Sequence, residues 1–229
     1  MQQNIQKHLP RVLGQKRLVN LKYKKYFRTT SLKQKGVGDL FLSDILLKKP
    51  KTFLEIGVFH GVTARNVCEL LCKLHGNDFK YIGLDLFEEN SQNENEIIPK
   101  TKFSNFLKTI YFNYIKKQNP YSIESVKDLL SKFIDNVSLL KGNSNNILKK
   151  IDMSKIDYVF LDGGHDYLTV INDLNCCIEV INCNGTILCD DYDLSYAPGV
   201  KKAIDEFVST NNFKCSIICN DRFAKIEKN

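Results

Sequence analysis

The sequence predicts an α/β fold: a doubly wound, mostly parallel seven-stranded sheet with an antiparallel terminal hairpin and a helical insertion. Short apolar runs alternate with longer segments in which apolar residues recur at helical spacing, as in successive strand–helix units. Several of the apolar runs lead directly into glycine or a carboxylate, as strand ends that open onto a ligand do. The length of 229 residues and a hydrophobic content of 43% suffice for one such domain with a full core.

The alternation begins near residue 37. The elements expected first are an amphipathic helix over 39–49 that stops at Pro50, a buried strand over 51–58, a helix over 63–74 that ends at Gly76, and a second strand over 80–87. Those expected later are a third strand at 136–143, a short helix at 145–151, a fourth strand at 156–162, a helix with Val170, Leu174, Ile178 and Ile181 on one face, a fifth strand at 185–191, a helix at 199–208 and a closing hairpin over 215–227 that turns at Asn220 and Asp221.

The insertion separates the second and third strands and covers about residues 88–136. Connections of this kind are usually shorter than about a dozen residues apart from their helix. Two stretches in it, 103–115 and 122–134, have apolar residues at helical spacing, and Ser122 is suited to cap the second. A lid over the strand ends is the functional interpretation, and a packing elaboration is the alternative.

Charge divides the chain into an arm, residues 1–36, and a domain, residues 37–229. Residues 1–38 carry 10 of the 33 Lys and Arg and no acidic residue, whereas the rest of the chain is slightly acidic. Aromatic and aliphatic residues are interleaved with these cations, as in a helix that contacts nucleic acid, an anionic membrane or an acidic glycan. A solvated arm without a partner is the alternative.

Cellular context is bounded by what the sequence lacks. It contains neither an apolar run of about 20 residues nor the apolar core of a signal peptide, so we expect a soluble, cytoplasmic protein without a transmembrane segment. The eight cysteines fall largely within predicted helices and strands without paired C-x-x-C spacing. They are therefore expected to be small apolar residues rather than disulfides or zinc ligands.

Polar residues gather where the strands end. Asp162 and His165 follow the fourth strand, separated by two glycines, and Asp190 and Asp191 end the fifth. Because the carboxyl ends of parallel strands share one edge of the sheet, these side chains are expected to meet there. The remaining strand ends carry Gly57 and Gly61 at the first turn, Asp85 after the second strand, and Gly142, Asn143 and Ser144 after the third.

In these motifs the chain resembles the class I S-adenosylmethionine-dependent methyltransferases, from about Phe53 to the end. The most specific stretches are LEIGVFHGVT, YIGLDLF, DYVFLDGGHDY and TILCDDYD, and the last two are similar to the metal-dependent O-methyltransferase branch that acts on small molecules and sugars. The resemblance implies a Rossmann-like methyltransferase fold. It also implies the following roles: Glu55, Gly57, Gly61 and Thr63 at the methionine part of the cofactor; Asp85 at the ribose; Asn143 and Ser144 at the adenine; Asp162, Asp190 and Asp191 as ligands of a divalent metal; and His165 as general base, with Asp162 also bordering the cofactor.

The residue types suit this chemistry in their own right. Methyl transfer to an alcohol needs an oxygen that is aligned with the S–CH3 bond and loses its proton. Carboxylates favour a hard cation such as Mg2+, which lowers the pKa of a bound hydroxyl, and a histidine with a pKa near ~6.5 accepts protons at neutral pH. The alternatives are a structural helix-start role for His165 and capping roles for Asp190 and Asp191.

The functional hypothesis is therefore metal-assisted O-methylation of a hydroxyl on a small molecule or sugar. The alternative is a nucleic-acid methyltransferase or binder that uses the basic arm, which predicts steep salt dependence. A nonenzymatic scaffold with a vestigial cofactor pocket is a further alternative. A nicotinamide-dependent oxidoreductase is disfavoured because the third glycine of the dinucleotide fingerprint is missing after Gly57 and Gly61.

Overall fold

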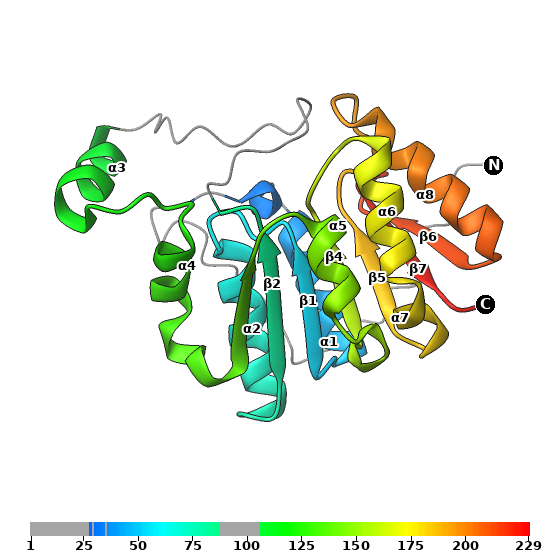
Figure 1. Cartoon of the computed structure of the whole chain (residues 1–229), viewed down its shortest axis with the longest axis horizontal. Helices are drawn as coiled ribbons and strands as arrows, with labels where there is room; N and C mark the ends of the chain where they lie inside the picture. Colours follow the sequence, from blue (N-terminus) through cyan, green and yellow to red (C-terminus); the bar gives the residue numbers. More distant parts are fainter. Residues whose placement is uncertain (1–27, 29, 35, 88–105) are drawn as a thin grey trace.

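The computed structural model of the protein has a seven-stranded sheet at its centre (Figure 1). The structure describes residues 28, 30–34, 36–87 and 106–229. The strand order is β3-β2-β1-β4-β5-β7-β6; the first five strands are parallel, and β7 pairs antiparallel with both β5 and β6. The strands are β1 Thr52–Ile56, β2 Lys80–Asp85, β3 Val137–Lys141, β4 Tyr158–Leu161, β5 Thr186–Cys189, β6 Lys214–Ile218 and β7 Phe223–Glu227. The predicted fold class, including the terminal hairpin, is confirmed.

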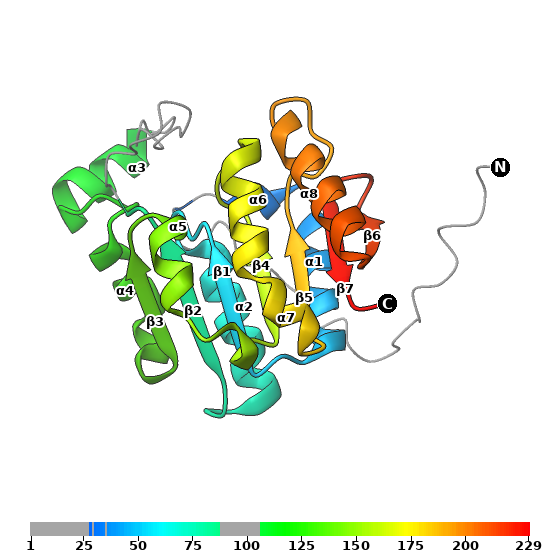
Figure 2. The same cartoon turned by 45° about the vertical axis from the view of Figure 1, so that its right-hand side comes forward.

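Helices cover both faces of the sheet, as Figures 1 and 2 show from two directions. They are α1 Val37–Lys48, α2 Val62–His75, α3 Phe106–Ile110, α4 Ile123–Leu130, α5 Ser144–Ile147, α6 Tyr167–Cys176, α7 Ile178–Asn182 and α8 Pro198–Asn211. Short helical turns are η2 Ser31–Lys33, η3 Tyr111–Lys116, η4 Ser131–Asn136, η5 Leu148–Lys150 and η6 Met153–Lys155. One apolar cluster joins the sheet to α6, α7 and α8, and a second joins it to α1, α2 and α4. The sheet is therefore the middle of three layers.

The two clusters follow from alternation along the strands. In β1, Leu54 and Ile56 belong to the first cluster, whereas Phe53 faces the second, where its ring stacks between Tyr81 and Tyr158. Successive side chains of a strand point to opposite faces, so a fully buried strand needs apolar residues on both. The near-continuous apolar runs of the sequence are thus explained by a sheet that is covered twice.

Local signals set most element ends. Ser122 caps α4 by accepting a hydrogen bond from the Ser125 N–H, and Gly76 follows the last residue of α2, both as predicted. The hairpin turns through Cys219, Asn220 and Asp221, all with positive φ. The helix expected to carry Val170 to Ile181 on one face is instead divided at Cys177, whose N–H donates to both Asp173 and Leu174 carbonyls. Both halves still pack on the first cluster.

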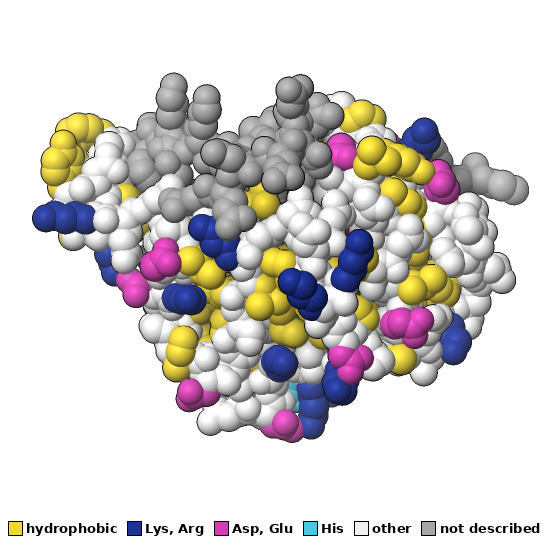
Figure 3. All heavy atoms as spheres, in the orientation of Figure 1, with side chains coloured by type: hydrophobic (Ala, Val, Ile, Leu, Met, Phe, Trp, Pro, Cys, Tyr) yellow, Lys and Arg dark blue, Asp and Glu magenta, His cyan; other side chains and the backbone are white. Residues whose placement is uncertain are grey.

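The described part of the insertion has two distinct ends. Its carboxyl-terminal end, α4 and η4, packs into the second cluster, whereas α3 and η3 project from the body (Figure 1). Hydrophobic side chains are exposed on the projecting part (Figure 3), among them Phe106 at 76% and Tyr114 at 73%. Elsewhere on the face in Figure 3, basic and acidic side chains are interspersed. No helix among the described residues is long and apolar enough to cross a membrane.

Candidate functional site

The carboxyl ends of β1, β4 and β5 meet at one edge of the sheet, as the sequence predicts. The backbone N–H of Asp162 donates to the Ile56 carbonyl at 2.8 Å, and that of Asp190 donates to the Leu161 carbonyl at 2.9 Å. Each aspartate thus continues the ladder by one residue beyond its strand. As a result, oxygen atoms of Asp162, Asp190 and Asp191 lie within 4.8 Å of one another.

Glycine permits the close approach of the first turn to this edge. Gly57 has a φ of 95°, and a Cβ atom there would lie 2.0 Å from the Asp162 carbonyl oxygen, so no other residue fits. Gly61 has a φ of 72° and starts α2, and a Cβ there would lie 2.9 Å from the Val126 side chain. The two glycines therefore hold the loop between the sheet edge and α4.

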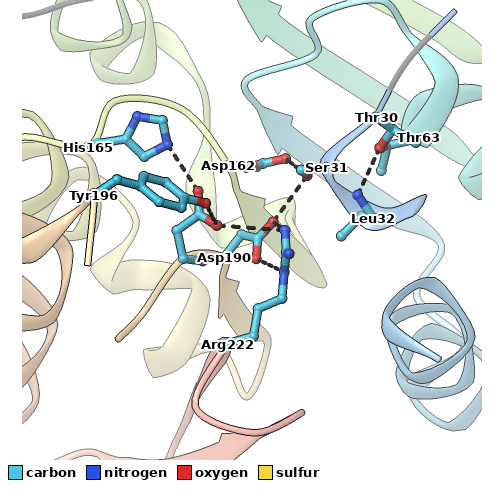
Figure 4. A network of polar contacts seen from close by, with 10 residues as sticks. Thr30, Ser31, Leu32, Thr63, Asp162, His165, Asp190, Tyr196 and Arg222 are labelled. Atoms are coloured by element: carbon cyan, nitrogen blue, oxygen red, sulfur yellow. Dashed lines mark hydrogen bonds and ion pairs between the residues drawn. The ribbon is translucent and has the colours of Figure 1, made fainter. Parts of the chain in front are cut away.

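Arg222 holds the carboxylate of Asp190 from below (Figure 4). Its Nε and Nη2 atoms donate to the two Asp190 oxygens at 2.7 Å each, and Nη2 also lies 3.6 Å from Asp191 Oδ1. All three residues are at most 5% exposed. Burial and the Asp191 charge raise the pKa of Asp190 despite the guanidinium. Sequence reasoning missed Arg222; the available signal was a lone arginine between the hairpin turn and an apolar strand.

Asp191 connects the edge to His165 and Tyr196. His165 Nε2 lies 3.0 Å from Asp191 Oδ2, and the Tyr196 hydroxyl donates to Asp191 Oδ1 at 2.7 Å (Figure 4). Burial alone would raise the pKa of Asp191, but these hydrogen bonds outweigh it and lower the pKa. The hydrogen bond between His165 and Asp191 raises the pKa of His165. When Nε2 donates to Asp191, Nδ1 is the acceptor nitrogen of the ring.

The charges at this edge suit a divalent cation. Three carboxylates face a single guanidinium, and burial together with the charges of Asp190 and Asp191 raises the pKa of Asp162 well above its usual range. A cation placed among these oxygens would relieve that repulsion. Although Arg222 contacts both oxygens of Asp190, each carboxylate oxygen has a second lone pair for a metal. The residues predicted as metal ligands therefore fit an oxygen-seeking cation such as Mg2+.

A short stretch before α1 crosses the same edge; we call Arg28 and residues 30–34 the N-terminal strap. Ser31 Oγ lies 3.3 Å from both Asp162 Oδ2 and Asp190 Oδ2, and Thr30 Oγ1 lies 3.0 Å from Thr63 Oγ1 in the first turn of α2 (Figure 4). Leu32 is fully buried in the second cluster. The strap lies within the predicted basic arm, and no sequence pattern indicates that it reaches the site.

Arg28 anchors the strap by hydrogen bonds to three main-chain carbonyls and one side-chain hydroxyl. Its Nη1 donates to the His60 and Pro120 carbonyls at 2.9 and 2.8 Å, and its Nη2 donates to the carbonyl and hydroxyl of Ser125 at 2.8 Å each. Burial lowers the pKa of Arg28 to about 10, so it still carries its charge at neutral pH. The guanidinium thereby joins the strap, the glycine turn and the insertion.

Asp85 lies at the end of β2 and already accepts hydrogen bonds from protein groups. The Phe59 N–H donates to Asp85 Oδ2 at 2.7 Å, and the Tyr121 hydroxyl donates to Oδ1 at 2.6 Å. Tyr121 belongs to the insertion, is 4% exposed and was not anticipated as a site residue. Asp85 Oδ1 also accepts a longer hydrogen bond from the Phe87 N–H at 3.4 Å, so Oδ2 is the oxygen that keeps a lone pair, and contact with a ribose remains a prediction.

Asn143 and Ser144 begin α5, directly after β3. The Asn143 side chain caps this helix by accepting the Asn145 N–H at 2.9 Å. The Gly142 N–H donates to the Asp85 carbonyl at 2.9 Å, which brings this turn next to the end of β2. Their predicted contact with adenine is not tested by these bonds.

Glu55 differs from the other site residues because it is fully buried beneath the edge. Its Oε2 accepts the Tyr81 hydroxyl at 2.5 Å, and its Oε1 has no hydrogen-bond partner among the described residues. Burial raises the pKa of Glu55 to about 8. Contact with the methionine part of a cofactor remains a prediction for this residue.

We expect Glu55→Gln to flatten the pH dependence of stability. The folded-state pKa is raised, so stability from protonated Glu55 is present below the unfolded pKa of 4.5 and is lost as pH rises through about 8. As pH rises from 5 to 8, the free energy of unfolding of the wild type should therefore fall by roughly 3–5 kcal/mol relative to that of the variant. Urea unfolding at several pH values measures this difference. The exposed Glu124→Gln is the control, and parallel curves for wild type and Glu55→Gln would contradict the expectation.

Known proteins resemble this chain in sequence and in fold. A family model described as a methyltransferase domain matches residues 54–192, more than half of the chain. The matched range runs from β1 through Asp190 and Asp191 and so includes every strand end described above.

Several solved structures with the same fold are methyltransferases by their names. A methyltransferase of Podospora anserina bound to SAH superposes with a TM-score of 0.57 at 18% identity, over 84% of this chain and 77% of that one. The O-methyltransferase NovP gives 0.56 at 18% identity, over 82% and 76% of the two chains. CalS11, a TDP-rhamnose 3′-O-methyltransferase of calicheamicin biosynthesis, gives 0.55 at 14% identity, over 86% and 81%. At these identities the likeness establishes the fold.

A relative by sequence is an uncharacterized protein of Acanthamoeba polyphaga mimivirus. The two are 42% identical over 55 residues, which is 24% of this chain. The match spans only 25% of that relative's length.

Proposed function

Because the chain belongs to the family of S-adenosylmethionine-dependent methyltransferases, we propose that it transfers the methyl group to a hydroxyl of a small molecule or sugar with the help of a divalent cation. The observation that carries this proposal is the meeting of Asp162, Asp190 and Asp191 beside His165 at the carboxyl edge of the sheet. Carboxylates and an imidazole are the groups that an alcohol acceptor requires, since its proton must leave.

The cofactor is proposed to lie across the first three strand ends. Gly57, Gly61 and Thr63 would surround its methionine part with Glu55 beneath, Asp85 would accept the ribose hydroxyls, and Asn143 and Ser144 would border the adenine. Support comes from the tight turn at Gly57 and from the bond that joins the Gly142 and Asp85 backbones, since both bring these residues to one side of the sheet. Asp162 follows β4, which lies between β1 and β5, so it borders both this region and the Asp190–Asp191 pair.

The acceptor is proposed to bind beside Asp191 and His165. Asp162, Asp190 and Asp191 would hold Mg2+ or a similar cation, which when bound lowers the pKa of a coordinated hydroxyl. Asp191 orients the His165 ring through Nε2, so that Nδ1 can take the acceptor proton. NovP and CalS11, by their names an O-methyltransferase and a sugar O-methyltransferase, support a small-molecule or sugar acceptor.

Titration with S-adenosylhomocysteine is the first test, and Asp85→Asn is the informative variant. The exchange removes a charged acceptor from the ribose and should weaken binding roughly 10- to 100-fold, since hydrogen bonds to charged groups contribute about 1.5–3 kcal/mol. Isothermal titration calorimetry measures both affinities, and Asp152→Asn at the exposed turn before η6 is the control. Absence of binding at millimolar ligand would refute the cofactor assignment.

The acceptor class is tested with labelled S-adenosylmethionine and Mg2+. We expect transfer to members of a panel of hydroxylated small molecules and nucleotide sugars, and loss of transfer on chelation. Incorporation into RNA or DNA instead, with steep salt dependence, would favour the nucleic-acid alternative and a role for the basic arm, whose residues 1–27 lie outside the described part.

A further inference from the structure

We propose that Ser31 is a fourth oxygen ligand of the cation, brought to the carboxylates by the N-terminal strap. This inference rests on the proposed function, because it concerns the cation site of Asp162, Asp190 and Asp191. It adds to that site a neutral hydroxyl from a segment about 130 residues before the first carboxylate in the chain.

The spacing around Ser31 favours coordination over simple hydrogen bonding. Its Oγ is 3.3 Å from Asp162 Oδ2 and 3.3 Å from Asp190 Oδ2. A hydroxyl has one proton and serves one of these oxygens at a time, and hydrogen bonds between oxygens are usually about 2.7–2.8 Å long. The two equal and longer separations place the hydroxyl oxygen at the same distance from both carboxylate oxygens, as expected of a ligand that shares a cation with them.

The same spacing matches neighbouring ligands of a divalent cation. Metal–oxygen distances run from about 2.0 Å for Mg2+ to about 2.6 Å for Ca2+, so adjacent ligands at right angles lie roughly 2.8–3.7 Å apart. The two 3.3 Å separations fall inside that range. A serine hydroxyl is also a hard oxygen ligand of the kind that such cations accept.

The strap is held by contacts on both sides of Ser31. These contacts fix the position of the Ser31 hydroxyl before a cation binds. Arg28 is held by four hydrogen bonds, Thr30 contacts Thr63, and Leu32 is fully buried. A ligand held in place in advance loses little conformational entropy when the metal binds. Cation affinity should consequently depend on Arg28 even though Arg28 lies away from the carboxylates.

Mn2+ titration of the full-length protein tests the proposal without requiring turnover. Ser31→Ala should weaken Mn2+ binding roughly tenfold, the lower end of the range for lost metal-supporting groups, while affinity for S-adenosylhomocysteine stays the same. Ser43→Ala is the matched control, since among the described residues that hydroxyl bonds to the Asp39 carbonyl of its own helix and to no group of the site. Near-ultraviolet circular dichroism shows that each variant is folded.

A softer ligand separates coordination from hydrogen bonding. Ser31→Cys should raise the preference for Cd2+ over Mn2+ at least severalfold relative to Ser31→Ala, because thiolate ligands favour soft metals. Ser43→Cys corrects for the native cysteines. If Ser31→Ala binds Mn2+ more weakly but Ser31→Cys shows no preference for Cd2+, the hydroxyl only donates a hydrogen bond. That result would overturn the ligand assignment.

Arg28→Ala completes the experiment as a double-mutant cycle. If the strap delivers Ser31, Arg28→Ala should weaken Mn2+ binding about as much as Ser31→Ala, and the double variant should be no weaker than either. Additive losses would contradict delivery by the strap. Failure of the wild type to bind Mn2+ would refute the cation part of the proposed function itself. Loss of Mn2+ binding in Asp191→Ala with unchanged binding in Ser31→Ala would refute only the assignment of Ser31 as a ligand.

Discussion

Asp190→Ala is expected to lower the free energy of unfolding by about 3–5 kcal/mol, the cost of leaving a buried charge without its partner. The Arg222 guanidinium is 5% exposed and donates two hydrogen bonds of 2.7 Å to Asp190. After the exchange, the ion-pair partner that Arg222 keeps among the described residues is Asp191, at the longer distance of 3.6 Å. Chemical denaturation at pH 7 measures the change.

Two comparisons isolate this cause. Asp193→Ala removes an aspartate three residues along the chain, whose ion pair with Lys201 is about half exposed, and it should cost at most about 1 kcal/mol. The double variant Asp190→Asn with Arg222→Met removes both charges of this ion pair, and it should recover much of the loss because neither member of the pair is left without its partner. Equal effects of Asp190→Ala and Asp193→Ala would show that the buried pair is not a major support of the fold.

His165→Ala is expected to reduce kcat by roughly 10²- to 10⁴-fold, the usual contribution of a general base. The ring contacts Asp191 and packs edge-on against Tyr196, and among the described residues no hydrogen bond joins it to the proposed cofactor residues. Affinity for S-adenosylhomocysteine should therefore remain within about twofold of wild type, since only the proton transfer is lost. The measurement is steady-state turnover with an acceptor from the panel, together with calorimetric titration of the cofactor product.

The control uses a second histidine of the same chain. His75 ends α2, at the opposite end of that helix from Gly61, so His75→Ala should leave kcat unchanged. Normal turnover in His165→Ala would mean that another group receives the proton. The structural-role alternative for His165 instead predicts a loss of stability with turnover per folded molecule preserved.

The parts of the site that sequence predicted are those governed by strand register. Asp162 and Asp190 each follow an apolar run, and parallel pairing carries both to one edge, so their proximity follows from pattern alone. The need for glycine at position 57 could likewise be predicted, because the backbone after β1 passes close to the backbone after β4 and leaves no room for a side chain. The seven strands and their order along the chain could be predicted from hydrophobic periodicity and turn residues alone.

The parts that sequence missed depend on long side chains that cross between elements. Arg222 reaches Asp190 from the closing hairpin, Tyr121 reaches Asp85 from the insertion, and Arg28 reaches backbone carbonyls, which carry no residue-specific signal. Neither propensity nor spacing encodes such contacts, because they are set by the packing of whole elements. The partner of the basic arm and the cytoplasmic location remain predictions.

The bonds of the N-terminal strap also bear on the order in which the protein assembles. Arg28 is joined to Ser125 across 97 residues, and Ser31 to Asp190 across 159. Contacts between segments so distant in sequence form late, because chain entropy is lost before they stabilise anything. During synthesis, the strap is made before the strands but finds its last partner only after the fifth parallel strand has been made. Completion of the proposed cation site would then report that the five parallel strands have assembled.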